Sequence, residues 1–174
     1  MTSPVTARRS GLWSIVRAVA EKTAASRWFR RYGPRFIPRV DRAVHAVTGG
    51  RLFVSQALVP TMLLTTTGYH TGSSRSTPLA CLPERGGSFL VVASNFGRPS
   101  NPAWSVNLLR EPHAQVSFRG RKLQVTAHPL TSEEKARAWP SLLRIWPVYQ
   151  RYAEISGRDL PVFRLQPTAR LSIR

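Results

Sequence analysis

Residues 63–79 read Leu-Leu-Thr-Thr-Thr-Gly-Tyr-His-Thr-Gly-Ser-Ser-Arg-Ser-Thr-Pro-Leu, which predicts two extended segments joined by a polar turn. The β-branched run before Gly68 favours a strand, and Gly68 and Gly72 favour a turn before the chain extends again at Pro78. This turn suits an anion, because glycine lets the backbone approach a ligand while hydroxyls, N–H groups and the Arg75 guanidinium donate hydrogen bonds. The same residues also fit an ordinary surface hairpin, so the turn alone leaves both interpretations open.

The rest of the chain after residue 61 contains short apolar segments rich in β-branched residues, separated by turn signals. They predict strands at 62–67, 77–82, 89–94, 114–118, 122–128 and 162–165, with tight turns at 85–87 and 118–121. Two helical segments interrupt these strands. The pattern therefore predicts an α+β fold built on a small antiparallel barrel.

The first of the two helices has clear start and stop signals. We expect it to begin with Asn101 as the cap and Pro102 at the first helical position, and to end before Pro112. Its spacing places Trp104 and Asn107 on one face.

The second helix is expected to begin at the capping box Thr131-Ser132-Glu133-Glu134 and to run through Trp139. Trp146, Tyr149 and Tyr152 recur every three residues after it. They should share one face of a continuing or restarted helix.

The N-terminal part of the chain has a different character from the rest. We expect residues 1–50 to form a basic amphipathic helical extension and residues 51–174 to form the barrel domain. Residues 10–32 combine arginines and tryptophans with apolar residues at helical spacing, which favours contact with an anionic membrane surface. Residues 34–48 are expected to pack on the domain instead.

The composition indicates an anionic partner. The 174 residues include 26 Lys+Arg against 8 Asp+Glu, a formal net charge of +18. A nucleic acid, an acidic membrane or a polyanionic cofactor would each suit this charge. No specific nucleic acid is expected, because the arginines spread along the chain without a recognised binding module. No apolar run is long enough to span a bilayer, and Arg17 interrupts the one signal-like stretch, so a cytoplasmic location is expected.

The residues that carry most enzyme chemistry are scattered. No carboxylate pair, metal-ligand spacing, nucleophile elbow or phosphate-binding loop stands out, and no metal site is expected. The single cysteine, Cys81, lies in an apolar strand-like run and should be a small buried hydrophobe. Demanding chemistry would then have to come from an organic cofactor.

Three groups of motifs carry a resemblance. Thr-Thr-Gly-x-x-Thr-Gly-x-x-Arg-x-x-Pro-Leu at 66–79 is followed by Val-Val-Ala-Ser-Asn-Phe-Gly-Arg-Pro-Ser-Asn-Pro-Ala-Trp-Ser-Val-Asn-Leu at 91–108, and by closing motifs at 146–152 and 160–167. In this order and spacing the chain resembles the deazaflavin-dependent nitroreductase family. That family is a branch of the split β-barrel flavin and deazaflavin oxidoreductases of actinobacteria.

The resemblance implies a split β-barrel that binds coenzyme F420, a 5-deazaflavin with a phosphate and an oligoglutamate tail; FMN is the less favoured cofactor. It implies hydride transfer from the reduced cofactor to a planar lipophilic small-molecule acceptor, such as a quinone, an enone or a nitroaromatic. A homodimer is expected by similarity to split-barrel flavoproteins. A non-catalytic barrel that binds a lipid or a tetrapyrrole is the alternative.

By position, the resemblance also implies site residues. Tyr149 and Tyr152 would be catalytic and, with Trp146, would line the acceptor side. The cofactor-binding residues would be Thr71, Gly72, Ser73, Ser74, Arg75, Pro78, Leu79, Ser94, Asn95, Gly97, Trp104 and Asn107. The chain departs from the family at Tyr69-His70, where a basic pair is common, and at Asn95-Phe96-Gly97, where Lys-Gly-Gly or similar is common.

Overall fold

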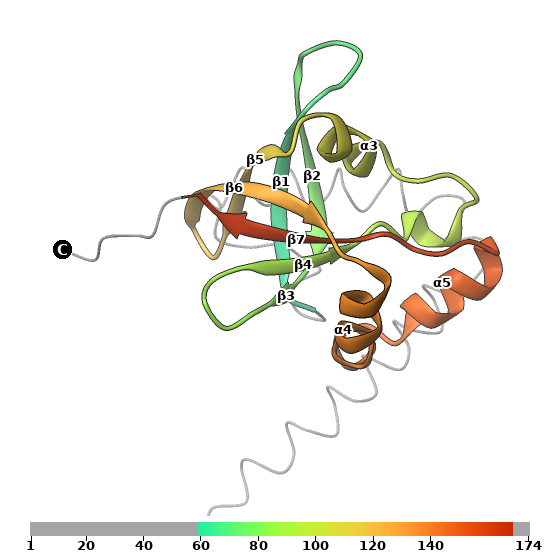
Figure 1. The fold of residues 1–174 in the computed structure, drawn as a ribbon. Coiled ribbons are helices and arrows are strands. Elements are labelled where there is room, and N and C mark those ends of the chain that lie inside the picture. Colours follow the sequence, from blue (N-terminus) through green and yellow to red (C-terminus); the bar gives the residue numbers. More distant parts are fainter. Residues whose placement is uncertain (1–58, 169–174) are drawn as a thin grey trace, which may run out of the picture.

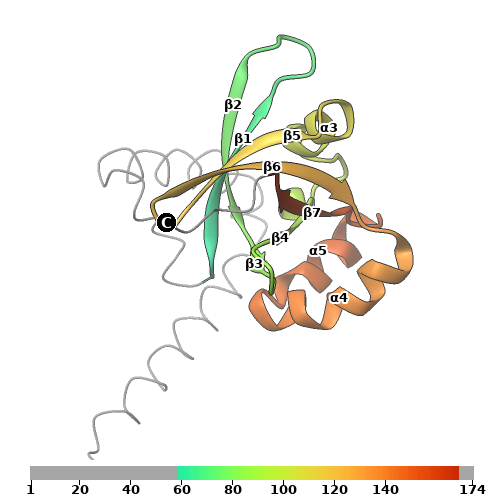
Figure 2. The ribbon, with the colours of Figure 1, turned by 60° about the vertical axis from the view of Figure 1, so that its left-hand side comes forward.

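A strongly curled antiparallel sheet, with helices at its margins, makes up the part of the chain that the computed structural model describes, residues 59–168 (Figures 1 and 2). In chain order the elements are β1 (Thr61–Thr67), β2 (Ser74–Ala80), β3 (Leu82–Pro83), β4 (Phe89–Val92), η2 (Asn95–Gly97), α3 (Ala103–Arg110), β5 (His113–Phe118), β6 (Arg121–Pro129), α4 (Ser132–Ile145), α5 (Val148–Ser156) and β7 (Val162–Pro167). The sheet order is β2-β1-β5-β6-β7-β4-β3. The expected α+β barrel is confirmed.

The sheet nearly closes on itself. β2 and β3 lie at opposite edges of the sheet, yet only Cys81 separates them along the chain. One continuous segment can join both edges only if the sheet curls until the edges approach each other. The strand expected at 77–82 is thus partly wrong: pairing of Thr67 with Ser74 extends β2 back to the turn, and the chain leaves the ladder at Cys81.

Two apolar clusters fill the two sides of β4. Phe89 and Val91 face the inside of the curled sheet, whereas Leu90 and Val92 face α4 and α5. Successive side chains of a strand point to opposite faces, so a strand covered on both sides is apolar throughout. This explains why the sequence around β4 is a continuous hydrophobic run.

The helix starts differ from expectation in one place. Thr131 caps α4 as predicted: its Oγ1 accepts from the Glu134 N–H at 3.2 Å, and the Glu134 carboxylate accepts from the Thr131 N–H at 3.0 Å. The predicted Asn101 cap of α3 is wrong, because Pro102 occupies the cap position and no side chain caps the helix. The Asn101 carboxamide accepts a hydrogen bond from Arg158 instead.

The helix that carries the aromatic trio is a restarted one. α4 ends at Ile145 with Trp146 as its C-cap, and α5 begins at Val148 after Pro147. The expected extension 1–50, its membrane-contacting segment 10–32 and the start of the domain at 51 lie outside the described residues. No helix within 59–168 is both long enough and apolar enough to cross a membrane.

Candidate cofactor site

The turn between β1 and β2 is closed by its own backbone. The Gly68 N–H donates to the Ser73 carbonyl at 2.8 Å, and the Gly72 N–H donates to the Gly68 carbonyl at 2.7 Å. A Cβ at Gly68 would lie 2.9 Å from Thr71 Oγ1, and Gly72 has a φ of 63°, so both positions favour glycine. The closed turn leaves the side chains of residues 71–75 exposed at the tip of a projecting hairpin (Figure 2).

Helix α3 fastens this hairpin to the barrel through Asn107. Its Nδ2 donates to Thr66 Oγ1 at 3.0 Å, and its Oδ1 accepts from the Tyr69 N–H at 3.1 Å. Asn107 is only 7% exposed, so both ends of its carboxamide are engaged inside the protein. Asn107, one of the expected cofactor residues, therefore holds the β1–β2 hairpin in a fixed position relative to helix α3.

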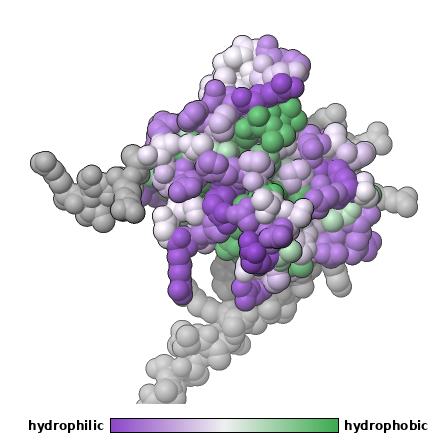
Figure 3. Space-filling model, viewed as in Figure 1, coloured by the Kyte–Doolittle hydropathy of each residue, from purple (hydrophilic) through white to green (hydrophobic). Residues whose placement is uncertain are grey.

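The surface beside the hairpin changes from polar to apolar. Arg110 of α3 lies over Tyr69, with its guanidinium carbon 5.2 Å from the ring centroid. Next to it Leu109 is 60% exposed, and Figure 3 shows apolar atoms gathered below the polar hairpin tip. Donors beside an apolar surface suit a molecule with an aromatic body and an anionic tail.

Three other expected residues of this region are partly or wholly covered. Trp104 is buried, with its ring centroid 5.7 Å from that of Phe163, and belongs to the core inside the sheet. Pro78 and Leu79 are half-buried on β2, opposite Leu63 and Met62 of β1. The expected contacts of this set with a cofactor remain predictions.

The segment after β4 has an unusual backbone. Asn95, Phe96 and Gly97 have φ values of 45°, 57° and 73°, three consecutive residues in the left-handed region. A Cβ at Gly97 would lie 3.2 Å from Cδ1 of Tyr152, so glycine allows α5 to approach the loop closely. The structure thus brings the expected residues of this loop against the helix that carries the two tyrosines.

Arg158, which the sequence analysis did not identify, holds this loop. Its Nε donates to the Arg98 carbonyl at 3.0 Å, and its Nη2 donates to the carbonyls of Ala93 at 3.1 Å and Ser94 at 3.0 Å. Its Nη1 donates to the Asn101 side chain. These partners are some sixty residues away, and an arginine after a helix-ending glycine has no distinctive pattern, so no sequence signal pointed to it.

The aromatic trio gathers near the same loop but is largely covered. Tyr149 and Tyr152 are 6% and 2% exposed, while Trp146 is half-buried. Burial, with smaller contributions from Cys81 and Tyr152, raises the pKa of the Tyr149 phenol above its ordinary value. Tyr149 therefore keeps its proton at neutral pH. The catalytic and acceptor-binding roles of the trio remain predictions.

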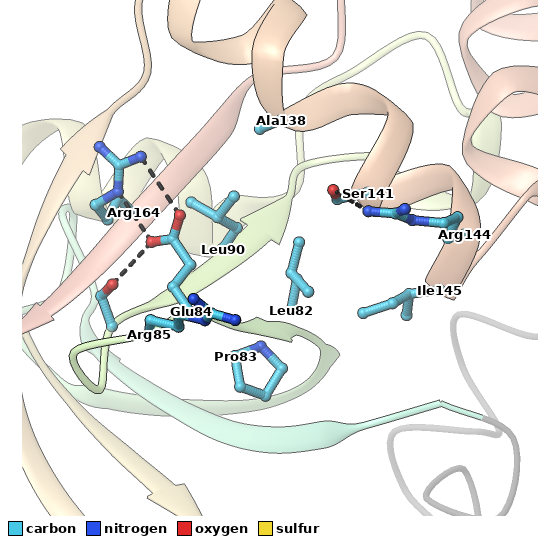
Figure 4. Close-up of a pocket in the computed structure, with 11 residues that line it drawn as sticks. Leu82, Pro83, Glu84, Arg85, Leu90, Ala138, Ser141, Arg144, Ile145 and Arg164 are labelled. Carbon is cyan, nitrogen blue, oxygen red and sulfur yellow. Dashed lines mark hydrogen bonds and ion pairs between the residues drawn. The ribbon is translucent and has the colours of Figure 1, made fainter.

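A pocket of about 660 Å³ between the β3–β4 turn and α4 contains none of the expected site residues (Figure 4). Its Glu84 carboxylate accepts from Arg164 Nε at 3.0 Å and from Ser88 Oγ at 2.8 Å. Arg164 also donates to Glu134 at 2.9 Å. Because these charges bind each other, we assign them to stabilising the fold.

Within residues 59–168, no three or more His, Cys, Asp or Glu side chains lie together as a metal site.

Comparison with known proteins gives the chain a family. The model of the F420H(2)-dependent quinone reductase family matches residues 36–167. An F420H(2)-dependent quinone reductase of Mycobacterium tuberculosis (strain ATCC 25618 / H37Rv) is 30% identical over 146 residues, which cover 79% of this chain and 94% of the relative.

The chain is also similar to two solved structures. One described as an F420-H2 dependent reductase (FDR-A) is 33% identical and covers 62% of this chain and 94% of its own, with a TM-score of 0.56. Another, described as a domain-swapped dimer, is 28% identical and covers 72% of this chain and 95% of its own, with a TM-score of 0.58. The expected split β-barrel, the cofactor F420 and an F420-dependent oxidoreductase are confirmed. The chain belongs to the F420H(2)-dependent quinone reductase family.

Proposed function

We propose that the β1–β2 hairpin holds the phosphate and acidic tail of F420, and that the loop at 94–97 borders its ring system. The observation that carries this proposal is the hairpin tip, where exposed hydroxyls and Arg75 stand on a turn fastened by Asn107. Hydroxyl and guanidinium groups are donors that phosphates and carboxylates prefer, so the side chains present fit the group. Arg110 adds a second guanidinium beside Tyr69.

The bound reduced cofactor supplies a hydride, and the protein orients the two reactants. We place a planar quinone beside Trp146, the least covered member of the aromatic trio, with Tyr149 and Tyr152 behind it. When a quinone accepts a hydride, negative charge develops on a quinone oxygen. A phenol that has kept its proton can donate a hydrogen bond to that oxygen. This assignment predicts that Tyr149→Phe lowers kcat with menadione while F420 binding stays unchanged, and an unchanged kcat would remove Tyr149 from this role.

Titration with F420 tests the hairpin. Arg75→Ala should raise the F420 Kd by about tenfold, since charge-assisted hydrogen bonds are lost. Arg121→Ala removes the same charge from the exposed first residue of β6 and serves as the matched control. Binding is followed by cofactor fluorescence and turnover by oxidation of F420H2 with menadione. Equal Kd values for wild type and Arg75→Ala would exclude the hairpin as the tail site.

Three further proposals concern the assembly of the protein and its N-terminal part. We infer a homodimer, since a solved relative is described as a domain-swapped dimer, and light scattering of the full chain tests it. We infer that residues 1–50 form an extension to the domain at 51–174 and that 10–32 contact an anionic membrane, because that segment is basic and amphipathic. Trp13→Glu with Trp28→Glu should then reduce sedimentation with anionic liposomes, and equal pelleting would contradict the membrane contact.

A further inference from the structure

We propose that Arg158 is a positioning residue for F420 binding, which acts by fixing the backbone of the loop after β4. This inference rests on the proposed place of residues 94–97 beside the cofactor. One guanidinium directs several hydrogen bonds into this one loop. Three carbonyls and one side-chain carboxamide, from residues 93, 94, 98 and 101, accept from Arg158.

Only an arginine fits this arrangement. A guanidinium is a flat fork with five N–H donors at fixed angles, whereas an ammonium has a single donor centre. The acceptors of Arg158 use its Nε, Nη1 and Nη2 at once, so they surround the fork in its own plane. No carboxylate within residues 59–168 pairs with Arg158, and burial lowers its pKa from the ordinary arginine value. Its charge is therefore balanced by the dipoles of the loop carbonyls.

Because Arg158 fixes the direction of the Ser94 carbonyl, it also fixes the direction of the Asn95 N–H in the same peptide unit. The peptide bonds of the described chain are trans, so a C=O and the N–H of the same peptide unit point in opposite directions. The Ser94 carbonyl points at Arg158, and the Asn95 N–H of that unit consequently points away from it. Outside the helices and strands of residues 59–168, no backbone carbonyl accepts from that N–H. We infer that it is the donor for an oxygen atom of the bound cofactor.

The left-handed run also needs an external support. Asn95 and Phe96 are not glycines, and side chains at positive φ are disfavoured. The Asn95 side chain donates to the Ser100 carbonyl at 2.8 Å, and Arg158 binds the carbonyls on both sides of the run. Without the guanidinium, the loop can relax toward ordinary backbone angles and turn the Asn95 N–H elsewhere. The loss would then appear in cofactor affinity.

The experiment compares Arg158→Ala and Arg158→Lys with wild type in full-length protein. We expect the F420 Kd to rise about tenfold in Arg158→Ala and severalfold in Arg158→Lys, while the menadione KM at saturating F420H2 stays within about twofold. Millimolar guanidinium ion should restore affinity in Arg158→Ala, whose cavity can accept it, but not in Arg158→Lys. A role in folding alone would not be rescued selectively in this way.

Arg164→Lys is the matched control, because Arg164 is also a half-buried arginine with several hydrogen bonds, all of them to Glu84 and Glu134. It should lower thermal stability and leave the F420 Kd unchanged. The proposal is overturned if both Arg158 variants bind F420 as wild type does, or if Arg164→Lys loses affinity equally. If Arg158→Ala does not fold, Arg158→Lys decides between these outcomes. An unchanged F420 Kd in Arg75→Ala would instead contradict the hairpin as the tail site. That result would not bear on Arg158, which is tested by its own two variants.

Discussion

Arg110 lies over the ring of Tyr69, with its guanidinium carbon 5.2 Å from the ring centroid, although the two residues are on different elements. Tyr69 also contacts the His70 ring, at 3.9 Å between centroids. Tyr69 and His70 occupy the position at which the deazaflavin-dependent nitroreductase family commonly has two basic residues. Helix α3 therefore places the Arg110 guanidinium beside residues 69–70 of the hairpin, where the chain has no lysine or arginine of its own.

Replacement of Arg110 should weaken cofactor binding. Arg110→Ala removes a cation from the proposed tail site and the cation–π contact with Tyr69, so the F420 Kd should rise about threefold to tenfold. The effect should shrink at high salt, because exposed charges are screened. Fluorescence titration at two salt concentrations measures both. Lys122→Ala, at an exposed position of β6, removes an equal charge and should leave the Kd unchanged; a similar loss in both variants would indicate only the general charge of the protein.

Asn107 should be important for stability as well as for the site. In Asn107→Leu, the buried Thr66 hydroxyl loses its donor and the part-buried Tyr69 N–H loses its acceptor, and polar groups left unsatisfied away from water are costly. We expect the free energy of unfolding to fall by about 2 kcal/mol, measured in urea. Thr66→Val, which removes one of these two hydrogen bonds, should cost less. A loss in Asn107→Leu no greater than that in Thr66→Val would contradict the role of Asn107 as the hairpin fastener.

Two glycines with positive φ should respond differently to alanine. Gly72→Ala meets open space, so it should cost about 1 kcal/mol for its backbone angle alone. Gly97→Ala has the same backbone cost and also places a Cβ 3.2 Å from Tyr152, so the total should be about 2–3 kcal/mol. Urea unfolding of the two variants measures the difference. Equal losses would mean that α5 moves aside without cost.

Cys81 should make stability depend on pH in the alkaline range. Burial raises the pKa of its thiol from 9.0 to about 12. The unfolded chain therefore releases the proton first, and this contribution to stability is complete below pH 9 and is lost as the pH rises toward 12. The free energy of unfolding should fall by up to about 1.4 kcal/mol per pH unit in that window.

Urea unfolding between pH 8 and pH 10.5 measures this slope, with Cys81→Ala as the comparison. The variant should be less stable at pH 8 but should lose less stability as the pH rises. Tyr149, whose pKa is also raised, contributes in the same direction in both proteins, and most of its contribution cancels because burial rather than Cys81 is the main cause of its shift. Parallel slopes would show that the Cys81 thiol ionises equally in the folded and unfolded chains.

Local patterns in the sequence determined most of the elements and the family. The strands, the two-glycine turn at 68–72 and the Thr131 capping box depend on backbone preferences and on contacts within a few residues, which a sequence displays directly. The order of motifs through 66–108, with the closing motifs, resembles a known family, and that resemblance implied the split barrel and its cofactor.

Tertiary structure alone decided what several of these residues contact. The sequence predicts Asn101 as a helix cap, but Asn101 accepts from Arg158, 57 residues later. Asn107 binds Thr66, 41 residues earlier, a contact that the sequence pattern does not show. Tyr149 and Tyr152 showed helical spacing, yet their burial depends on how α5 packs against η2. A side chain takes the partner that folding brings nearest, and pairings between residues so far apart along the chain leave no periodic trace in the sequence.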